Sequence, residues 1–316
     1  MTRVAAIDCG TNTIRLLVAD LTLTDEALTI EDVTRHGEIV RLGKDVDRTG
    51  RLDDAALART LAVTRAFAAQ CESLGVESLR FIATSATRDA ANKDVFVDGV
   101  RDLLGIEPEV VTGREEAELS FLGSLVGATA VPGTARLVAD LGGGSTELVL
   151  GERVPTAAHS MDVGSVRITE RYLADGVTPE AEGAARAEVR AHLDRAATTV
   201  DLAAPGTLVG LAGTVATVTA HGLGLDGFEP TRIHGARLPV ETVLASCDAL
   251  LHSTAEQRVA MGYLAPGRRD VIAAGALVWS EVVSRVAAET AGTDHAITHT
   301  VTSLHDILDG IALSQA

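Results

Sequence analysis

The sequence predicts an α/β protein built from two related domains. Apolar runs of strand length alternate along the chain with longer stretches of helical spacing, which is the pattern of an α/β fold. A repeated unit of strand, Asp, any residue, Gly, polar turn and second strand occurs at residues 4–19 and again at residues 138–150, roughly 130 residues apart. The chain has 316 residues, enough for two domains with their own cores. The repeat therefore predicts two domains that face each other across one phosphate.

Composition narrows the classes of partner. Hydrophobic residues make up 46% of the chain and the mean hydropathy is +0.21, but aromatic residues make up only 3%, so broad stacking platforms for bases or sugars are not expected. The formal net charge of −17 argues against nucleic acid or an anionic membrane as the main partner. The same charge opposes an anionic substrate, which would need bound metal ions and a local basic surface to approach.

The cysteines and the N-terminus indicate a cytoplasmic protein. Cys9, Cys71 and Cys247 are isolated, odd in number and lack the spacing of a zinc site, so we expect reduced, mostly buried thiols. The apolar run after Arg3 ends at Asp8 and is too short for a signal sequence. The most apolar stretch, residues 208–225, is interrupted by glycines, threonines and a histidine, so no membrane span is expected.

The second copy of the repeat carries the stronger ligand pattern. Three consecutive glycines at 142–144 let the backbone approach a ligand closely, and successive N–H groups in such a turn form an anion-binding nest. Asp140 at the mouth of the turn suits a hard cation, and Glu147 lies just beyond the turn. A phosphate with its metal ion is the predicted occupant. The candidate phosphate-binding residues here are Gly142, Gly143, Gly144, Ser145 and Thr146.

The first copy follows the same pattern with a different turn. Asp8 corresponds to Asp140, and Gly10, Thr11, Asn12 and Thr13 are the candidate phosphate-binding residues. No Gly-Lys-Ser/Thr of a Walker loop is present, and a strand follows the glycines where a dinucleotide fingerprint would open a helix. Ordinary β-hairpin turns are the alternative for either copy taken singly. Two copies with matching Asp and Gly favour phosphate binding.

The remaining elements of the first half follow from local pattern. The helix at 53–74 begins at Asp53, a favourable N-cap, and ends at Gly75. The hydroxyl-rich turn 84–89 contains Arg88, whose guanidinium can donate two bonds to a phosphoryl group or pair with a surface carboxylate. A helix from Gly113 to about residue 126 begins with several glutamates, which usually complement the helix dipole. Other predicted elements are a first hairpin at 1–21, strands at 28–33, 37–42, 78–83 and 109–111, and a helix near 92–104.

A domain boundary is predicted at the turn pair Pro132-Gly133, and the elements of the second half follow from local pattern as well. His234 and His305 are expected to be structural, and Arg268 and Arg269 could guide a polyanion. The predicted strands are 157–163, 208–211 and 296–300, and the predicted helices are a short one within 164–173, then 179–200, one after residue 213, 240–252, 254–261, one from about 271 to 291, and 303–313.

Several segments together resemble the exopolyphosphatase / guanosine pentaphosphate phosphohydrolase (Ppx/GppA) family. The two turns match its phosphate loops, and the likeness extends over essentially the whole chain, without the extra C-terminal helical region of longer members. The matching segments are residues 7–17, 83–92, 112–123, 140–147, 213–217, 233–235, 269–275 and 303–310.

The resemblance implies a fold, a site and a domain division. It implies two actin-like or sugar-kinase-type (ribonuclease H-like) domains, residues 1–130 and 131–316, with the active site in the cleft between them and a last helix able to pack back on the first domain. It implies that Glu116, the second glutamate of its motif, is the catalytic residue that orients or deprotonates water, with Arg88 adding positive charge. It implies Mg²⁺, or another divalent cation, held through Asp140 and Glu147, with Asp8 as a further candidate ligand.

The leading functional hypothesis is an exopolyphosphatase that releases terminal orthophosphate from inorganic polyphosphate. The alternative within the family is hydrolysis of the 5′ γ-phosphate of guanosine pentaphosphate, which scarce aromatic residues weakly disfavour. A non-catalytic sensor of polyphosphate or stringent-response nucleotides, and a sugar kinase or actin-like ATPase, are hypotheses of other classes. Homodimerisation is also implied by the resemblance.

Overall fold

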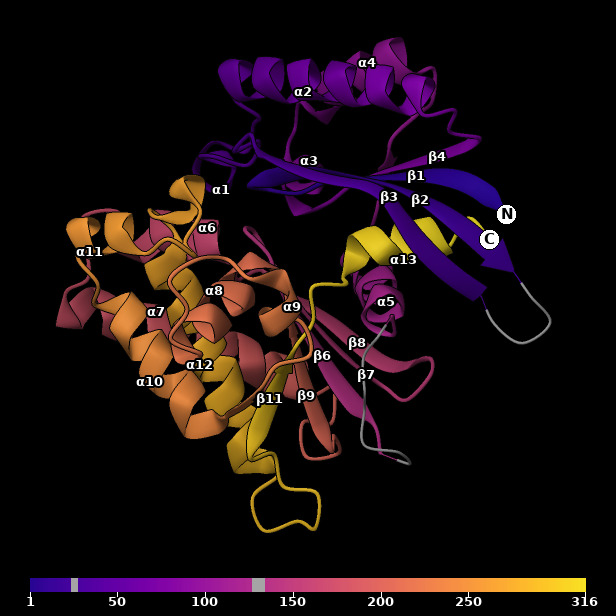
Figure 1. Cartoon of the computed structure of the whole chain (residues 1–316). Helices are drawn as coiled ribbons and strands as arrows, with labels where there is room; N and C mark the ends of the chain where they lie inside the picture. Colours follow the sequence, from indigo (N-terminus) through magenta and orange to yellow (C-terminus); the bar gives the residue numbers. More distant parts are fainter. Residues whose placement is uncertain (24–27, 127–133) are drawn as a thin grey trace. The chain divides into compact units, whose positions relative to one another are not determined.

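The computed structural model describes residues 1–23, 28–126 and 134–316. The chain forms two compact units: Met1–Gly123 together with Ile307–Ala316, and Ser124–Asp306. Each unit holds one mixed β-sheet with helices packed on it, so the predicted α/β class with two related domains is confirmed (Figure 1). The predicted boundary at Pro132-Gly133 lies outside the described residues.

The first unit contains a five-stranded sheet in the order β3-β2-β1-β4-β5. β1, β2 and β3 form an antiparallel meander, and β4 and β5 are added parallel to β1. Parallel neighbours end at the same edge of a sheet, so the segments that follow β1, β4 and β5 lie together at that edge. The strands are β1 Thr2–Cys9, β2 Thr13–Leu23, β3 Leu28–Ile39, β4 Ser78–Ala83 and β5 Glu109–Val110.

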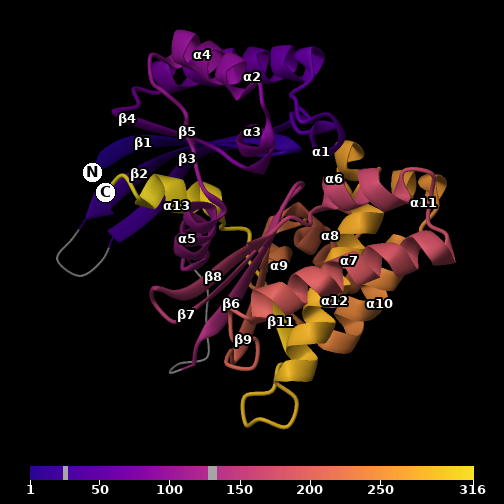
Figure 2. The ribbon, with the colours of Figure 1, turned by 180° about the vertical axis from the view of Figure 1, so that it is seen from behind.

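Alternate residues of β1 enter two different cores of this unit. Ile7 and its neighbours on one face pack with Phe81 and Phe96 beneath α2 and α4. Val4 and Ala6 on the other face pack against the C-terminal helix α13. Figures 1 and 2 show the two helical layers on opposite faces, and both termini in this unit. The helices are α1 Val46–Thr49, α2 Asp54–Ser73, α3 Ser85–Asp89, α4 Lys93–Leu104, α5 Gly113–Ser124 and α13 Ile307–Leu313.

The third strand corrects one prediction. Residues 28–39 form one continuous strand, where two strands at 28–33 and 37–42 were predicted. β3 is hydrogen-bonded to β2 throughout, with a register shift at Val18/Ala19, so the polar residues 34–36 do not interrupt it. Residues 40–43 then leave the sheet and bind the first turn through backbone hydrogen bonds.

The second unit repeats the strand order of the first. Its sheet runs β10-β11-β9-β6-β7-β8, in which β6, β7 and β8 are the antiparallel meander and β9 and β11 are parallel additions. The strands are β6 Arg136–Leu141, β7 Thr146–Gly151, β8 Pro155–Met161, β9 Thr207–Leu211, β10 Arg237–Pro239 and β11 His299–Thr302.

A helical layer buries one large core in this unit. Trp279 on α12 is its largest fully buried side chain, and α12 contacts α10, α8, α7 and β6. The last strand lies at 299–302, later than the predicted 296–300, and the last helix begins at Ile307 rather than at residue 303. The helical segments are α6 Ser165–Ile168, η1 Thr169–Leu173, α7 Pro179–Ala197, α8 Ala212–Gly222, α9 Pro230–Ile233, α10 Val240–Leu251, α11 Ala255–Ala260, η2 Pro266–Arg268 and α12 Ile272–Glu289.

The thiols and the helices agree with the sequence expectations. Cys9, Cys71 and Cys247 are free and buried, and burial raises the pKa of the Cys71 thiol to about 11. In the described ranges, every helix is too short or too polar to span a bilayer.

Candidate active site

The first turn joins β1 to β2 and is held open by the segment that follows β3. Gly10 N–H donates to the carbonyl of Thr13 at 3.0 Å, which closes the turn. The carbonyl of Asn12 accepts from Val40 and Arg41, and the carbonyl of Thr11 accepts from Gly43. In a trans peptide the N–H of the next residue points the opposite way. The N–H groups of Asn12 and Thr13 are therefore directed away from residues 40–43.

Gly43 permits this contact because it has no side chain. A Cβ at this position would lie 2.4 Å from Thr11 Cγ2 and 2.9 Å from Ala86 Cβ. Any larger residue would push residues 40–43 off the turn. Residues 40–43 therefore support the first loop.

Hydroxyl and amide groups line the same edge of this sheet. Thr11 Oγ1 and Ser85 Oγ are hydrogen-bonded at 2.9 Å, which ties the first turn to α3. Asn12 is only 8% exposed, and among the described residues neither its Nδ2 nor the Oγ1 of Thr87 has a hydrogen-bond partner. A buried amide without a partner costs free energy, so its retention needs an explanation.

Arg88 and Glu116, both predicted from the sequence, are brought together at this edge. Arg88 Nη1 on α3 donates to Glu116 Oε2 on α5 at 3.1 Å and to the carbonyl of Val111 at 2.8 Å. Glu116 is 8% exposed. The neighbouring glutamates have other roles: Glu115 accepts from the N–H and hydroxyl of Thr112, which lowers its pKa, and Glu118 pairs with Arg114 on the surface. Glu116 is the member of the trio that faces inward.

The second turn joins β6 to β7, and α6 holds all three glycine carbonyls. The carbonyl of Gly142 accepts from Ser165 N–H at 3.0 Å, and that of Gly143 accepts from Val166 and Arg167 at 2.8 and 3.1 Å. The carbonyl of Gly144 accepts from Arg167 Nε at 2.7 Å.

These contacts also fix the direction of the N–H groups in the same three peptide units. Because the three carbonyls face α6, the N–H groups of Gly143, Gly144 and Ser145 point away from it. Within the described residues these three N–H groups donate no backbone hydrogen bond. Three aligned free donors form an anion-binding nest of the predicted kind.

Gly164 brings α6 against this turn. A Cβ on Gly164 would lie 2.5 Å from the carbonyl carbon and oxygen of Gly143 and 2.7 Å from Gly144 N. The backbone of Gly164 is extended (φ −153°), so a close approach, rather than its conformation, explains the glycine. Neither Gly164 nor Arg167 was identified from sequence, because their partners lie 20 or more residues away. The glycine before a short helix was the only hint.

The two aspartates of the repeat have cross-strand partners of different charge: a carboxylate for Asp140 and a guanidinium for Asp8. Asp140 is directly opposite Glu147 on β7, and both are buried, with Ser160 Oγ donating to Glu147 Oε1 at 2.7 Å. Asp8 is directly opposite Arg15 on β2, and its Oδ2 accepts from Arg15 Nε and Nη2 at 3.0 and 2.6 Å. Only the second copy thus places two carboxylates face to face.

The turn after β9 lies at the same sheet edge as the second loop. β9 runs parallel to β6, with Leu211 beside Asp140. Ala212 then has φ +68°, a left-handed conformation that costs about 1–2 kcal/mol for a residue with a side chain. The Arg268 guanidinium packs on Gly213, where an added Cβ would lie 2.2 Å from it.

The histidines and Arg269 occupy structural positions nearby. The rings of His234 and His305 pack edge to face with centroids 4.8 Å apart, and Leu304 N–H donates to His234 Nδ1 at 3.1 Å. Arg269 Nη2 donates to the carbonyl of Val259 at 3.5 Å. Among the residues that the structure describes, no group of three or more His, Cys, Asp or Glu side chains is arranged to hold a metal ion.

Comparison with known proteins supports the same family from the whole chain. The family model described as the Ppx/GppA phosphatase family matches residues 22–298. Exopolyphosphatase 2 of Mycobacterium tuberculosis is 45% identical over 322 aligned residues, covering 100% of this chain and 99% of that protein. Guanosine-5′-triphosphate,3′-diphosphate pyrophosphatase of Photobacterium profundum is 32% identical over 172 residues, covering 54% of this chain and 33% of that protein.

Solved structures extend the likeness to the fold. The crystal structure of an exopolyphosphatase-like protein is 41% identical with a TM-score of 0.93, covering 99% of this chain and 98% of that one. The Aquifex aeolicus member of the Ppx/GppA family is 25% identical with a TM-score of 0.77 and covers 99% and 97% of the two chains. The family model matches most of this chain, and a relative that is 45% identical aligns over its full length. This chain therefore belongs to the Ppx/GppA phosphatase family.

Proposed function

We propose that this protein is an exopolyphosphatase, which hydrolyses the terminal phosphoanhydride bond of inorganic polyphosphate and releases orthophosphate. The observation that carries the proposal is the second loop, in which α6 occupies the carbonyls of Gly142, Gly143 and Gly144 and leaves three N–H groups aligned for an anion. The full-length match to a protein named exopolyphosphatase 2 supports this substrate class.

The first loop would bind the same phosphate chain. Asn12 Nδ2 is a buried donor that finds no partner in the described part of the chain, and a phosphate oxygen would satisfy it. Thr11 and Thr13 would add donors beside Gly10, and Ser145 would do so in the second loop. Thr146 fits this role less well than predicted, because its buried hydroxyl donates to the carbonyl of Val163 at 2.7 Å. In this proposal residues 1–130 contribute the first loop and residues 131–316 contribute the second.

A divalent cation such as Mg²⁺ fits the second copy of the repeat better than the first. Asp140 and Glu147 are hard oxygen ligands that face each other across two strands, and like charges placed so repel unless a cation offsets them. Asp8 fits less well, because Arg15 already donates twice to one of its oxygens. When bound, the ion would supply positive charge to the phosphate oxygens.

Glu116 would act on the attacking water. The water oxygen forms a bond to the terminal phosphorus while the bond to the bridging oxygen breaks, and Glu116 accepts the proton that the water loses. The shortened polyphosphate leaves as a phosphate anion, so no separate general acid is required. Arg88 holds the Glu116 carboxylate and would offset charge on the transferring phosphoryl group.

Replacement of Glu116 tests this assignment. Glu116→Gln keeps the size of the side chain and removes the base, so kcat for phosphate release should fall about 10³-fold with little change in KM. Glu118→Gln is the matched control on the same helix, since Glu118 pairs with Arg114 on the surface. Undiminished hydrolysis by Glu116→Gln would refute the catalytic role, and a wild-type protein that binds polyphosphate without turnover would favour a sensor.

A further inference from the structure

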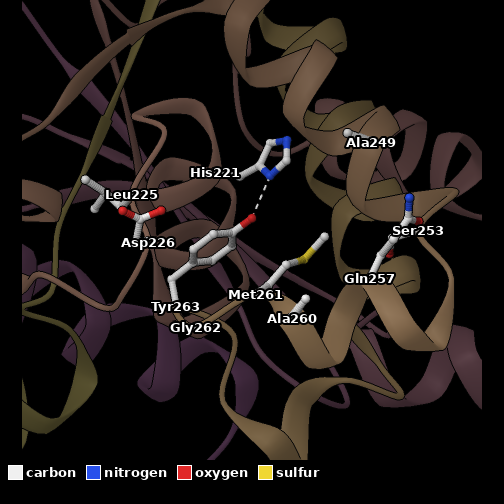
Figure 3. A pocket seen from close by; sticks show the side chains of 10 residues that line it. All are labelled: His221, Leu225, Asp226, Ala249, Ser253, Gln257, Ala260, Met261, Gly262 and Tyr263. Atoms are coloured by element: carbon white, nitrogen blue, oxygen red, sulfur yellow. Dashed lines mark hydrogen bonds between the residues drawn. The ribbon is translucent and has the colours of Figure 1, made fainter.

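A cavity separate from both phosphate loops lies within the second unit. Its volume is about 400 Å³, in the range of small-molecule sites. His221 is the tenth residue of α8, so at 1.5 Å per residue it lies about 14 Å from the turn at Ala212 beside the second loop. Figure 3 shows the lining side chains, which come from the ends of α8 and α10, from α11 and from the segments next to them.

The charges of the lining exclude a phosphate ligand. The lining contains no lysine or arginine. His221 is the one group there that could become cationic, and burial lowers its pKa, so its ring is neutral at pH 7. Asp226 is exposed, and its carboxylate makes no hydrogen bond or ion pair with the described residues. A polyphosphate would therefore meet one negative charge in the lining, and the Arg258 guanidinium behind Ser253 already donates to the Ser253 hydroxyl and to the carbonyl of Arg269.

The hydrogen-bonding groups favour a donor. His221 Nδ1 and the Tyr263 hydroxyl are joined at 2.7 Å (Figure 3). When Nδ1 carries the proton and donates to Tyr263, the other ring nitrogen is left as an acceptor. Gln257 uses its Oε1 to accept from Thr254 in the capping box of α11. The cavity thus offers a carboxylate and an imidazole nitrogen to a ligand that donates.

Of the other lining residues, Ser253 is polar, but its hydroxyl donates to the carbonyl of Leu250 and accepts from Arg258 Nε, and most of the others are apolar. Leu225, Ala249, Ala260 and Met261 present only hydrocarbon and thioether groups. An aliphatic stem would remove this surface from water, which is favourable in proportion to the area covered. A net charge of −17 also raises the local concentration of cations around the protein.

We propose that this cavity binds a primary alkylammonium compound of the aliphatic polyamine class. The ammonium group donates to Asp226 and to the His221–Tyr263 pair, and the methylene stem lies on the apolar wall. This site is independent of the proposed hydrolysis, because it shares no residue with either phosphate loop.

Titration calorimetry of the full chain with putrescine, without substrate, tests the proposal. We expect saturable binding that 1,4-butanediol, an uncharged molecule of similar length, does not show. Asp226→Asn should weaken putrescine binding at least fivefold, since it removes the charge and keeps the shape. Asp175→Asn is the control, an exposed carboxylate of the same unit outside the cavity, and should leave binding unchanged.

A second variant separates the cavity from diffuse attraction. Ala249→Leu fills the cavity from α10 without changing charge and should weaken binding to a similar extent. Equal weakening by Asp226→Asn and Asp175→Asn, or wild-type binding by Ala249→Leu, would overturn the proposal. Nα-acetyl-lysine methylamide distinguishes the sources of the amine: binding weaker than that of putrescine supports a free polyamine, and tighter binding overturns that assignment in favour of a lysine side chain.

Discussion

Replacing Gly164 by alanine tests whether α6 sets the shape of the second phosphate loop. The new Cβ would lie 2.5 Å from the carbonyl group of Gly143 and 2.7 Å from the nitrogen of Gly144, and all of these are backbone atoms. An ordinary contact needs at least 3.4 Å, so loop and helix must separate by about 0.9 Å. The backbone of Gly164 is extended and accepts alanine without strain, so the change acts through this contact only.

A displacement of this size is expected to lower activity by a known order of magnitude. Misplacing catalytic or binding groups by about 1 Å can lower activity about 10²-fold. We therefore expect Gly164→Ala to reduce kcat/KM for phosphate release from polyphosphate about 10²-fold. Crowding of this kind also destabilises a protein by about 1–3 kcal/mol, which urea unfolding measures.

Gly183→Ala is the matched control. Gly183 lies inside α7, where an added Cβ meets no atom within 4 Å, so alanine should stabilise the helix by about 0.5–1 kcal/mol and leave activity unchanged. A folded Gly164→Ala protein with wild-type kcat/KM would show that the tight packing of α6 does not matter to the chemistry.

Three further substitutions test other contacts. Arg167→Ala should lower kcat/KM about tenfold, because it removes the charged hydrogen bond to the carbonyl of Gly144. The kcat/KM of Arg167→Lys should lie between those of the wild type and Arg167→Ala, since lysine lacks the planar guanidinium, and equal values for the wild type and both variants would contradict this. Asp309→Ala should reduce the free energy of unfolding by about 3 kcal/mol, because it leaves Arg35 without its fully buried partner. Asp32→Ala, which removes the exposed partner of Arg35, should reduce it by less than 1 kcal/mol. Similar losses for the two variants in urea unfolding would refute the distinction. Ala212→Gly relieves the left-handed conformation, so it should raise the free energy of unfolding by about 0.5 kcal/mol after the entropy of glycine is subtracted. The urea midpoint should rise accordingly, and a lower midpoint would contradict this.

Local patterns were predictable from the sequence because their causes lie within a few residues. The helix that follows Asp53 begins as predicted, with the Asp53 carboxylate accepting from Ala56 N–H at 2.9 Å. The strand–turn–strand repeat was equally local, since alternating apolar residues and glycines define it. Arg88 and Glu116 were predicted separately as site residues, Glu116 through the resemblance. Their contact was not predicted, because 28 residues separate them.

Contacts between distant segments were not predictable in the same way. The continuity of β3 depends on its pairing with β2, which overrides the polar residues in its middle. Gly43, Gly164 and Arg167 matter because segments 20 or more residues away in sequence pack against them, and local sequence does not show which segments these are. Asp8 and Arg15 are seven residues apart and form an ion pair across a hairpin, so only the strand register reveals it.

Release of orthophosphate from polyphosphates of graded length, and from guanosine pentaphosphate, tests the proposed function most directly. The assay is run with Mg²⁺ and again after chelation with EDTA. We predict Mg²⁺-dependent release that is faster from polyphosphate than from the nucleotide and that Gly164→Ala reduces on every polyphosphate. Absence of release from polyphosphate, or a rate on guanosine pentaphosphate equal to or above it, would contradict the assignment.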